Sequence, residues 1–571
     1  MSVASATVGD GRVVSQAEER RVIFASSLGT VFEWYDFYLY ATLAPFFAAL
    51  FFPPGNETAA LLSAFAAYAA GFLVRPFGAL VFGRLGDLVG RKYTFLVTIM
   101  VMGASTFAVG LVPTFGTHTL PVIGEVGGVG WTAPILLVTL RLLQGLALGG
   151  EYGGAATYVA EHSRHNERGY TTSFIQTTAT LGMFLALLVI GLGRYYQDAK
   201  SFSEWGWRIP FLISLILLVF SVWIRLKLNE TPIFQKMKEE GKGSERPLTE
   251  SFFHYPNNKY VLLALLGATA GQGVVWYTGQ FYALFFLTLI LKVDPLTAYI
   301  MIGISLLIGT PFFIVFGWLS DRIGRLKIIL GGCLIAALTY YTVLFPALTH
   351  YVNPDLEKFQ QTNQLTVTVD PATCQLSAPW NVPTPCDNAR DILTKAGLSF
   401  TTTNGAAGSL PTLAISGPSG VKTIDSAAAP NWATANAPKW LAALTQAGYP
   451  PKADPAKFNW IMIELILVVM VIYVTMVYGP IAAFLVELFP TKIRYTSMSL
   501  PYHIGNGWFG GMLPLVATAL VAASGNIYYG LWYPIGVAIM TFIIGSIFLT
   551  ETKDTDIVAS SGISVQGKLA T

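Results

Sequence analysis

Long apolar stretches dominate this chain, and short charged segments separate them. Twelve of these stretches are close to 20 residues long or longer. About 20 apolar residues cross a bilayer core of about 30 Å as a helix, and inside lipid the backbone must satisfy its own hydrogen bonds. The pattern predicts an all-α polytopic membrane protein with twelve transmembrane helices, over 22–50, 60–82, 93–113, 134–160, 171–193, 208–228, 259–291, 295–316, 327–348, 458–486, 497–523 and 527–549.

The charged segments between these stretches repeat. The turn 83–92 recurs as 317–327, with glycine, aspartate and arginine at equivalent places, and a glutamate followed by an arginine seven residues later occurs twice. The repeat predicts two pseudo-symmetric six-helix halves, 22–228 and 259–549. In transporters, such duplicated halves rock about a central site. The candidate gate residues on the inner side are Gly83, Asp87, Arg91, Glu161, Arg168, Asp321, Arg325, Glu487 and Arg494.

Composition and charge agree with this class. Hydrophobic residues make up 53% of the chain and charged residues only 12%, against roughly 25% charged in soluble proteins. Lysine and arginine gather in the segments that would lie inside, whereas the short outer loops hold only Arg194, Lys200 and Lys292. By the positive-inside rule we expect both termini in the cytoplasm.

This orientation defines the remaining segments. The tails 1–21 and 550–571 and the central loop 229–258 are expected to be cytoplasmic. The net charge is only +3, and the basic residues lie in segments that we expect at the inner membrane surface. We therefore expect membrane lipids as neighbours and no nucleic acid as a partner. Residues 1–21 are polar and the first apolar stretch continues into a spanning helix, so no cleavable signal peptide is expected.

The segment 349–457 interrupts the second half. It is rich in Pro, Ala, Thr and Asn and lies between predicted helices 9 and 10, on the outer face. We find no clear strand or helix periodicity in it. Cys374 and Cys386 in an outer loop predict a disulfide in an oxidising compartment. The alternative is a poorly ordered linker with two free thiols.

Ionisable residues inside the apolar stretches are candidates for function, because each costs about 2.5–3.5 kcal/mol on insertion scales. Glu33 and Asp36 share one face of the first helix. An acid held by an arginine can take up a proton when the arginine is released. We expect Asp36 or Glu33 to carry a proton with Arg75 as partner, and Glu151 to be the reserve. Alternatively, Glu33–Arg75 and Arg141–Glu151 are static pairs that fix the helices.

Further polar and aromatic residues lie within the predicted helices. Arginines would suit a carboxylate substrate, whereas aromatic rings could face a quaternary ammonium group. The alternative readings are helix packing through small residues and tyrosines of an interfacial belt. The candidate substrate-binding residues are Arg75, Arg141, Gln176, Tyr277, Gln280, Tyr473, His503 and Asn506.

Other functional classes fit less well. The six histidines are scattered and form no metal motif, and no phosphate-binding Gly-x-x-x-x-Gly-Lys-Ser/Thr sequence is present, which argues against an enzyme and against ATP-driven transport. We expect no cofactor, with the proton as the coupling ion, and a monomer. A receptor-like protein would use 349–457 as its ligand-binding domain, and the lack of periodicity argues against that reading. A facilitator without ion coupling stays open.

The turns 83–92 and 317–327 resemble the signature loops of the major facilitator superfamily. The chain is most similar to its metabolite:proton symporter family, whose members carry dicarboxylates, citrate, shikimate, and betaine or proline. The resemblance implies proton-coupled uptake of a small polar metabolite, an organic acid or zwitterion, across a bacterial inner membrane. It rests on residues 33–37, 75–78, 141–145 with 149–151, 161–169, 206–211, 230–232 and 487–494.

The chain departs from the family pattern in two places. Leu88 stands where the superfamily turn usually has arginine, so we expect a weaker ionic latch in the first half. The insertion 349–457 is unusually large, and the family gives no role for it.

The direction of transport has its own signal in the sequence. The glycine-rich helix-5 signature of antiporters is absent from 171–193, which favours symport.

Overall fold

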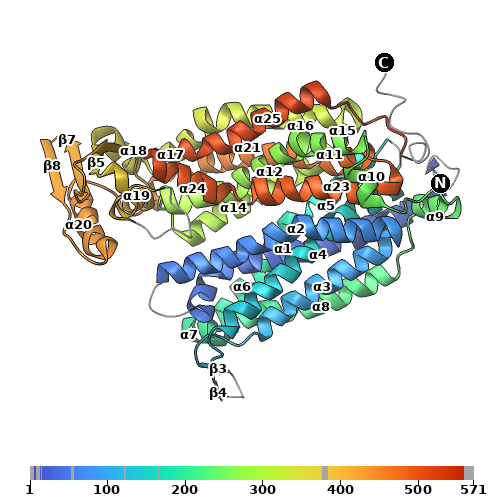
Figure 1. The fold of residues 1–571 in the computed structure, drawn as a ribbon, viewed down its shortest axis with the longest axis horizontal. Coiled ribbons are helices and arrows are strands. Elements are labelled where there is room, and N and C mark those ends of the chain that lie inside the picture. Colours follow the sequence, from blue (N-terminus) through green and yellow to red (C-terminus); the bar gives the residue numbers. More distant parts are fainter. Residues whose placement is uncertain are drawn as a thin grey trace.

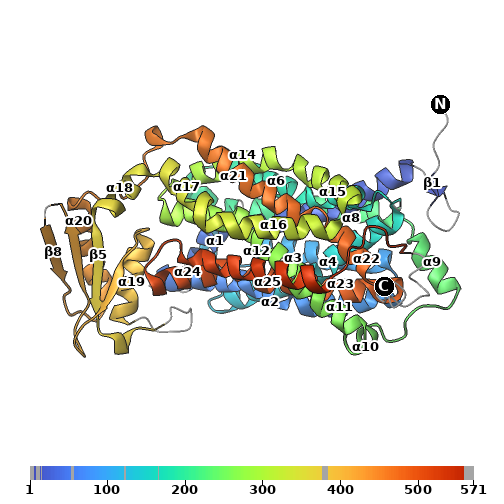
Figure 2. The ribbon, with the colours of Figure 1, turned by 90° about the horizontal axis from the view of Figure 1, so that it is seen from above.

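The computed structural model describes residues 6–7, 13–14, 16–52, 57–120, 124–164, 166–375, 384–418 and 420–557. Two helical bundles lie side by side, the first blue to cyan and the second green to red (Figure 1). Both chain termini lie at one end of the bundles, which we call the terminal end. The insertion projects from the other end, which we call the domain end (Figures 1 and 2).

The first half contains six long helical spans. A break at Thr177 divides the fifth span into α5 and α6, and two strand pairs, β1–β2 (Ala6–Thr7, Val13–Val14) and β3–β4 (His118–Leu120, Gly124–Val126), lie outside the spans. The helices are α1 Gln16–Phe51, α2 Glu57–Leu88, α3 Arg91–Leu111, α4 Thr132–His162, α5 Arg168–Gln176, α6 Thr178–Tyr196, α7 Ala199–Ser201 with η1 Phe202–Gly206, and α8 Arg208–Leu226.

In the second half, π-helical and 3-10 segments interrupt the helical spans more often. Short helices α9 (Pro232–Glu239) and α10 (Pro247–Phe252) connect the halves. The spans that follow are Asn257–Ile290 (α11 Asn257–Ala264, η2 Leu265–Thr269, α12 Ala270–Tyr277, η3 Thr278–Tyr282, α13 Ala283–Phe285, η4 Phe286–Ile290), Pro295–Ile323 (α14 Pro295–Gly309, α15 Pro311–Ile323) and Arg325–Val352 (α16 Arg325–Thr339, η5 Tyr340–Leu344, α17 Phe345–Val352). After the insertion come Trp460–Leu488 (α21 Trp460–Tyr478, α22 Ile481–Leu488), Thr491–Ser524 (η8 Thr491–Ile493, α23 Arg494–His503, η9 Ile504–Gly510, α24 Leu513–Ser524) and Tyr529–Phe548 (η10 Tyr529–Leu531, α25 Trp532–Phe548).

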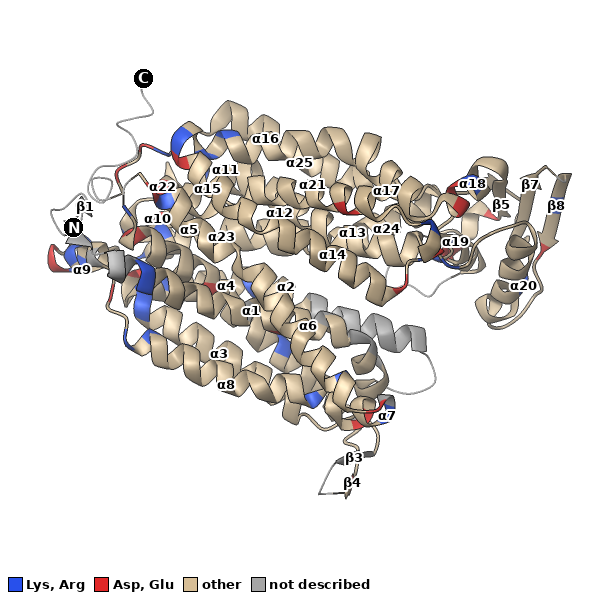
Figure 3. Ribbon diagram, turned by 180° about the vertical axis from the view of Figure 1, so that it is seen from behind, with Lys and Arg blue, Asp and Glu red and all other residues tan. Residues whose placement is uncertain are grey.

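Length and composition identify these spans as membrane helices. Among the described residues, ten helical spans are long and apolar enough to cross a bilayer. With α1 and α2, of 36 and 32 residues, which lie in the first bundle, all twelve predicted stretches fall in long helices. Charged residues gather near the two ends of the ribbon and are sparse between them (Figure 3). This distribution is expected because a charge is costly at membrane depth.

Close backbone contact holds the first half together. Gly145 and Gly149 of α4 face α2, where an added Cβ would lie 2.1 Å from the Gly71 carbonyl oxygen and 2.2 Å from that of Arg75. Helices can approach this closely only where side chains are absent, which is the usual use of small residues between membrane helices. These contacts fix α2 against α4.

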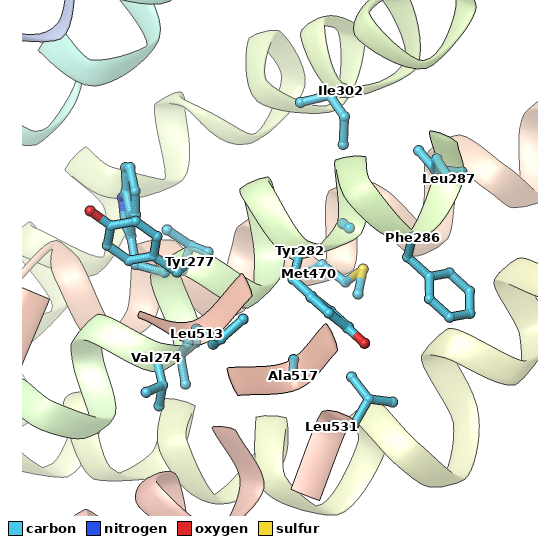
Figure 4. Packing of buried hydrophobic residues seen from close by; sticks show 14 of the residues in the cluster. Val274, Tyr277, Tyr282, Phe286, Leu287, Ile302, Met470, Leu513, Ala517 and Leu531 are labelled. Atoms are coloured by element: carbon cyan, nitrogen blue, oxygen red, sulfur yellow. The ribbon is translucent and has the colours of Figure 1, made fainter. Parts of the chain in front are cut away.

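The span Asn257–Ile290 is the main irregular helix of the second half. Three π-helical segments interrupt it, η2 (Leu265–Thr269), η3 (Thr278–Tyr282) and η4 (Phe286–Ile290). Each such segment widens the helix locally and is frequent at functional sites. Tyr282 and Phe286 pack in the apolar core of this half beside residues of the later spans (Figure 4).

The insertion is a folded domain, although its sequence shows no clear strand or helix periodicity, and the alternative of a poorly ordered linker with two free thiols is wrong. A mixed four-stranded sheet, in the order β6-β5-β7-β8, lies beside three helices. Its core is made by alternate residues of β5 and β7 and by Trp432 and Trp440. The elements are α18 Pro354–Thr362, β5 Gln364–Val369, η6 Pro371–Thr373, α19 Pro385–Lys395, β6 Thr401–Asn404, β7 Thr412–Gly417, β8 Gly420–Asp425, α20 Trp432–Gln446 and η7 Pro455–Lys457.

The periodicity was missed because the strands are short and two of them are exposed edges. β6 and β8, at the two sides of the sheet, expose most of their residues. A strand that is not buried on one face carries no clean alternation of apolar and polar positions. The structure joins Cys374 and Cys386 in a disulfide bond, the pairing that the sequence predicted. This bond ties the segment after β5 to α19.

Candidate functional site

At the terminal end, two aspartates each receive a helix from the opposite half. Asp87, near the end of α2, accepts hydrogen bonds from the backbone N–H groups of Tyr495 (3.3 Å) and Thr496 (2.8 Å) at the start of α23. Asp321, near the end of α15, accepts bonds from Gly169 (2.8 Å) and Tyr170 (2.7 Å) at the start of α5. A carboxylate at a helix N-terminus satisfies free N–H groups and the helix dipole.

Glycines make these approaches possible. A Cβ added at Gly83 would lie 2.9 Å from the Thr496 Cα, and one at Gly86 would lie 2.0 Å from the Tyr495 ring. In the other half, a Cβ at Gly317 would lie 2.6 Å from the Gly169 carbonyl oxygen. The glycines of the repeated turn therefore serve contact between the halves.

Each aspartate belongs to a group of four ionisable side chains, and we call the two groups quartets. The first quartet is Asp87, Arg91, Glu161 and Arg494, and the second is Asp321, Arg325, Glu487 and Arg168. In the first, Arg494 lies 2.9 Å from Glu161 across the halves, and Arg91 is 3.9 Å from Glu161.

The second quartet repeats these pairings with different spacings. Arg325 lies 2.9 Å from Glu487 within its own half, whereas Arg168 of the first half is 3.5 Å from Glu487. Within each turn the aspartate pairs with its arginine, at 3.1 Å for Asp87–Arg91 and 2.7 Å for Asp321–Arg325. All nine predicted gate residues therefore meet in two equivalent places.

The expectation of a weaker latch in the first half, based on Leu88, is wrong. The cross-half ion pair is shorter in the first quartet than in the second. Arg322, which stands at the place equivalent to Leu88, lies with its guanidinium 3.7 Å from the centre of the Trp318 ring. The arginine at this place therefore stacks on an aromatic ring of its own helix, and its replacement by Leu88 leaves the first quartet intact.

The structure adds a second repeat that the sequence analysis missed. Glu230 accepts a bond from the Lys92 N–H (3.1 Å) at the start of α3, and Glu551 accepts one from the Arg325 N–H (2.8 Å) at the start of α16. The next residue is a threonine in both cases and donates to the quartet glutamate, Thr231 to Glu161 and Thr552 to Glu487. The signal in the sequence is Leu-x-Glu-Thr, at 228–231 and 549–552.

Burial in this loop changes the acid–base behaviour of Glu230. Loss of solvent raises the pKa of its carboxyl above the usual value of 4.5, and hydrogen bonds from Thr231 and Lys92 oppose that rise. Beyond the second repeat the chain continues across the terminal end. The Thr555 carbonyl accepts a bond from Arg168 (2.9 Å) and the Ile557 carbonyl accepts one from Thr491 (3.0 Å). The segment after α25 thus contacts both halves.

Deeper in the first half, Asp36 is paired with Arg141 and not with Arg75, which corrects the predicted partner. Asp36 lies 3.1 Å from Arg141, and Gln144 donates to its other oxygen at 3.1 Å. Gln144 also accepts from Arg141 at 2.6 Å and donates to Thr106 at 3.0 Å. The reason is geometric: α1 packs on α4, which brings Arg141 and Gln144 together on the acid.

The other predicted acid pairs also change. Glu151 pairs with Arg225 of α8 instead of Arg141, and it accepts a bond from Thr98 at 2.8 Å. Arg225 lies over the Phe95 ring, 3.4 Å from its centre. Sequence reasoning missed Arg225 because it stands at the end of its helix, where a charge is not unusual. The side chain of Glu33 lies outside the described residues.

Between the halves lies a cluster of aromatic rings. Trp34 and Phe37 of α1 contact Trp276 and Phe281, with ring centres 4.9 and 5.2 Å apart. Nearer the terminal end, Tyr152 of α4 stacks on Tyr502 of α23, with centres 3.7 Å apart and planes 2° apart.

Hydrogen bonds join further residues to the stacked pair Tyr152 and Tyr502. Gln176 donates to the Tyr152 hydroxyl at 2.8 Å, and the hydroxyls of Tyr478 and Tyr502 lie 2.8 Å apart. Helices of both halves therefore build the aromatic cluster. Tyr152 and Tyr502 were not predicted, because a tyrosine in an apolar helix reads equally well as core.

Several buried polar atoms in this region have no hydrogen-bond partner among the described residues. Buried polar groups are nearly always bonded, so these atoms are candidates for contact with a ligand or water, although the Nε atoms of the paired arginines Arg141 and Arg225 also have no partner. Arg75 lies over the Phe72 ring, 4.3 Å from its centre, and close enough to His503 to act on it electrostatically. The atoms are Arg75 Nε, Gln176 Oε1, Trp276 Nε1, Gln280 Oε1 and His503 Nε2.

The last three residues predicted to bind substrate already contact other side chains of the protein. Asn506 is already bonded to Gln272 through two reciprocal hydrogen bonds of 3.0 and 2.9 Å. Tyr277 contacts the Phe72 ring across the halves, at 6.2 Å between centres. Tyr473 faces Thr339 and Tyr340 inside the second half, so the structure does not bring it to the central cluster.

Comparisons with known proteins identify the family of this chain. The family model of the Major Facilitator Superfamily matches residues 26–355, more than half of the chain, and ends where the insertion begins. This chain belongs to the Major Facilitator Superfamily. The twelve-helix fold and the absence of enzymatic chemistry follow from this membership, as predicted. The chain is an integral membrane protein and a transporter of small metabolites.

The similar curated proteins are bacterial transporters. The shikimate transporter of Escherichia coli is 33% identical over 346 residues, which cover 60% of this chain and 75% of that protein. The alpha-ketoglutarate permease of Escherichia coli is 34% identical over 56% of this chain and 71% of the relative. The proline/betaine transporter of Salmonella typhimurium is 33% identical over 60% and 66% of the two chains.

Among solved structures, the proton:xylose symporter XylE bound to 6-bromo-6-deoxy-D-glucose has a TM-score of 0.63. The sequence identity is 16%, and the match covers 95% of this chain and 99% of that chain. A double tryptophan mutant of XylE gives a TM-score of 0.64 at 14% identity, over 95% and 98% of the chains. At these identities the likeness shows the shared fold.

Proposed function

We propose that this protein imports a small metabolite that bears a carboxylate group, together with a proton, by alternating access. The observation that carries the proposal is the pair of polar sites in the first half: a buried acid, Asp36, held by Arg141, and a second buried arginine, Arg75, whose Nε has no hydrogen-bond partner among the described residues. One site suits a proton and the other an anionic group.

The orientation of the transporter follows from charge. Lysine and arginine are frequent in the segments of the terminal end and scarce in the short loops of the domain end, so the positive-inside rule places the terminal end in the cytoplasm. The disulfide Cys374–Cys386 of the inserted domain then lies in an oxidising compartment. We propose a bacterial inner membrane as the location, with a monomer surrounded by lipid as the working unit.

The two quartets are the cytoplasmic gate in this proposal. Hydrogen bonds and ion pairs that join the halves gather at the terminal end, so the cytoplasmic side is closed. Release of substrate to the cytoplasm requires that Glu161–Arg494 and Arg168–Glu487 part and that Tyr152 leave Tyr502. A rocking motion of the halves about the central cluster does both.

The substrate class rests on Arg75 and its surroundings. The relatives carry shikimate, alpha-ketoglutarate, and proline or betaine, each of which has a carboxylate. A guanidinium binds a carboxylate through two parallel hydrogen bonds. Gln176, Gln280, Trp276 and His503 provide unpartnered polar atoms for the rest of the molecule, and the aromatic rings provide apolar or cation–π contact.

Proton coupling needs an acid whose charge depends on the state of the transporter. Asp36 lies 3.1 Å from Arg141 and accepts a hydrogen bond from Gln144. If rocking moves α1 or α4, the same buried carboxyl loses this support and takes up a proton, because burial without a cation favours the neutral acid. Glu151, held by Arg225 and Thr98, is the reserve acid, and Glu33 stays a candidate from the sequence.

The test is transport in proteoliposomes. A thermal-shift screen with shikimate, alpha-ketoglutarate, proline and betaine first selects a ligand, because a ligand that binds the folded state raises its stability. Asp36→Asn is then expected to abolish proton-driven accumulation, because it removes the proton-carrying acid, while exchange of labelled for unlabelled substrate continues. Glu151→Gln and Glu33→Gln are the parallel variants.

Two outcomes would revise the proposal. If all three variants still accumulate substrate in a protonophore-sensitive way, the proton site lies elsewhere, and His503 is the next residue to test. If the wild type is indifferent to protonophore and pH, the protein is an uncoupled facilitator. Arg75→Lys tests the substrate part: it keeps the charge but not the paired hydrogen bonds, so binding in the thermal-shift assay should weaken.

A further inference from the structure

The inserted domain is joined to several helix ends of the second half at once. The Ala453 N–H donates to the Lys292 carbonyl (3.0 Å), and the Asn353 side chain donates to the Leu291 carbonyl (2.9 Å). Both carbonyls directly follow the end of the helix Asn257–Ile290. A backbone carbonyl in this position would otherwise need another partner. The domain thus supplies hydrogen-bond donors to the carbonyl groups at the outer end of this helix.

Close backbone packing strengthens the same contact. Gly397, in the turn after α19, has φ +71°, and a Cβ added to it would lie 2.1 Å from the Ile290 carbonyl oxygen. The Lys292 ammonium contacts the Lys395 carbonyl at the end of α19. Burial against the domain lowers the pKa of Lys292 to about 8. The turn at 395–397 therefore lies directly on the end of the helix Asn257–Ile290.

The domain also holds the other outer ends of the second half. The Phe400 N–H donates to the Gly525 carbonyl (2.7 Å), in the connection between the last two spans. The Asn459 N–H donates to the Tyr351 carbonyl (3.1 Å), and Lys457 lies 2.6 Å from Asp355. The domain is therefore bonded to the ends of spans Asn257–Ile290 and Thr491–Ser524, and the chain enters and leaves it at the ends of Arg325–Val352 and Trp460–Leu488, which are bonded to each other.

The helix Asn257–Ile290 is the one whose outer end has most reason to bend. It carries Trp276, Tyr277 and Phe281, which contact α1 and α2 across the halves. The π-helical segment η3 begins directly after Tyr277 and contains Phe281, and η4 forms the last turn of the helix. These segments depart from the regular hydrogen-bond pattern of the α-helix, so without support the outer turns can move separately from the rest of the half.

We propose that the inserted domain is a brace that couples the outer end of the helix Asn257–Ile290 to the other outer helix ends of the second half. With the brace docked, the outer turns move only with the whole half. Entry from the domain end then depends on rocking of the two halves and not on local bending at η3 and η4. This inference concerns the domain and stands apart from the identity of the substrate and from proton coupling.

The variant that tests the brace is Gly397→Ala in the full-length protein. The new Cβ collides with the Ile290 carbonyl and the left-handed conformation is strained. Gly408→Ala is the matched control: Gly408 also has a positive φ, +75°, and belongs to the same domain, but a Cβ there meets nothing within 4 Å. The two variants share the backbone strain and differ in the collision.

The measurement is hydrogen–deuterium exchange of peptides from 283–293, with peptides from β5 and β7 reporting on the domain itself. Gly397→Ala should speed exchange in 283–293 at least about tenfold, and Gly408→Ala should leave it within about twofold of the wild type. Whether the domain undocks or unfolds in Gly397→Ala, the helix end loses its support. Unchanged exchange in 283–293, or an equal increase in Gly408→Ala, would overturn the proposal.

Discussion

The two quartets at the terminal end have the same residue types, one aspartate, one glutamate and two arginines, but their closest ion pairs differ. In the first, the close contact runs between the halves, with Glu161 and Arg494 2.9 Å apart, while the contact within the half, Arg91–Glu161, is 3.9 Å. In the second, the close contact lies within one half, Arg325–Glu487 at 2.9 Å, and the cross-half contact Arg168–Glu487 is 3.5 Å. The first quartet is therefore the stronger link between the halves.

Different partners of the arginines explain the difference. Arg325 gives two hydrogen bonds to Glu487, from Nε at 3.1 Å and Nη2 at 2.9 Å, so this glutamate is already neutralised by its own half. Arg91 instead donates to the carbonyls of Gly86 and Thr491, which leaves Glu161 to Arg494. A pair of equivalent sites in sequence thus becomes one strong and one weaker latch.

The largest expected effect comes from breaking the first quartet. Arg494→Met leaves Glu161 buried without its close cation, and such a loss costs about 3–5 kcal/mol. We expect a marked drop in the thermal unfolding temperature and faster thiol labelling of a cysteine placed at the terminal end. Arg322→Met, which removes an arginine stacked on Trp318 outside the quartets, should change both measurements little. Equal effects of the two variants would contradict the latch.

The second-largest effect tests the asymmetry directly. Arg168→Met removes the longer cross-half contact, while Glu487 keeps Arg325, so we expect a loss of about 1–3 kcal/mol. The double-mutant cycle Glu161→Gln with Arg494→Met should give a larger coupling energy than Glu487→Gln with Arg168→Met. If the two coupling energies are equal, the distances do not report the strength of the latch.

The two aspartates should behave alike, because each accepts two backbone N–H groups from the opposite half. Asp87→Asn and Asp321→Asn each keep one acceptor oxygen and lose the charge at a helix N-terminus. We expect a loss of about 1–2 kcal/mol for each in chemical or thermal unfolding. A much larger effect for one aspartate would show that the pseudo-symmetry fails at this level too.

The smallest effect concerns pH and Glu230. Burial raises the pKa of this carboxyl above 4.5, so the folded protein binds the proton more tightly than the unfolded chain does. Its contribution to stability is fully present below pH 4.5 and is lost as pH rises through the folded-state pKa. The unfolding temperature of Glu230→Gln, relative to that of the wild type, should therefore rise as pH increases. A constant difference between the two proteins at all pH values would contradict the shift.

Much of this architecture could be predicted from the sequence because local rules set it. Apolar stretches long enough for a bilayer fixed the helices, and the repeated turns 83–92 and 317–327 fixed the two halves. Pairing was predictable only where a repeat marked it, as for Asp87 and Asp321. The partner of Asp36 was not, since Arg75 and Arg141 are both suitable arginines and only the packing of α1 on α4 chooses between them.

The sequence by itself determined the class of protein and the number of spans, because membrane insertion acts on each stretch separately, and its repeated turns marked the residues of the two quartets. Only the tertiary structure decided which ions pair, where Tyr152 meets Tyr502, and that the inserted segment 349–457 forms a folded domain on helix ends of the second half. Those outcomes depend on contacts between segments far apart in the chain, such as Gly397 with Ile290. No local pattern carries the distance between two helices.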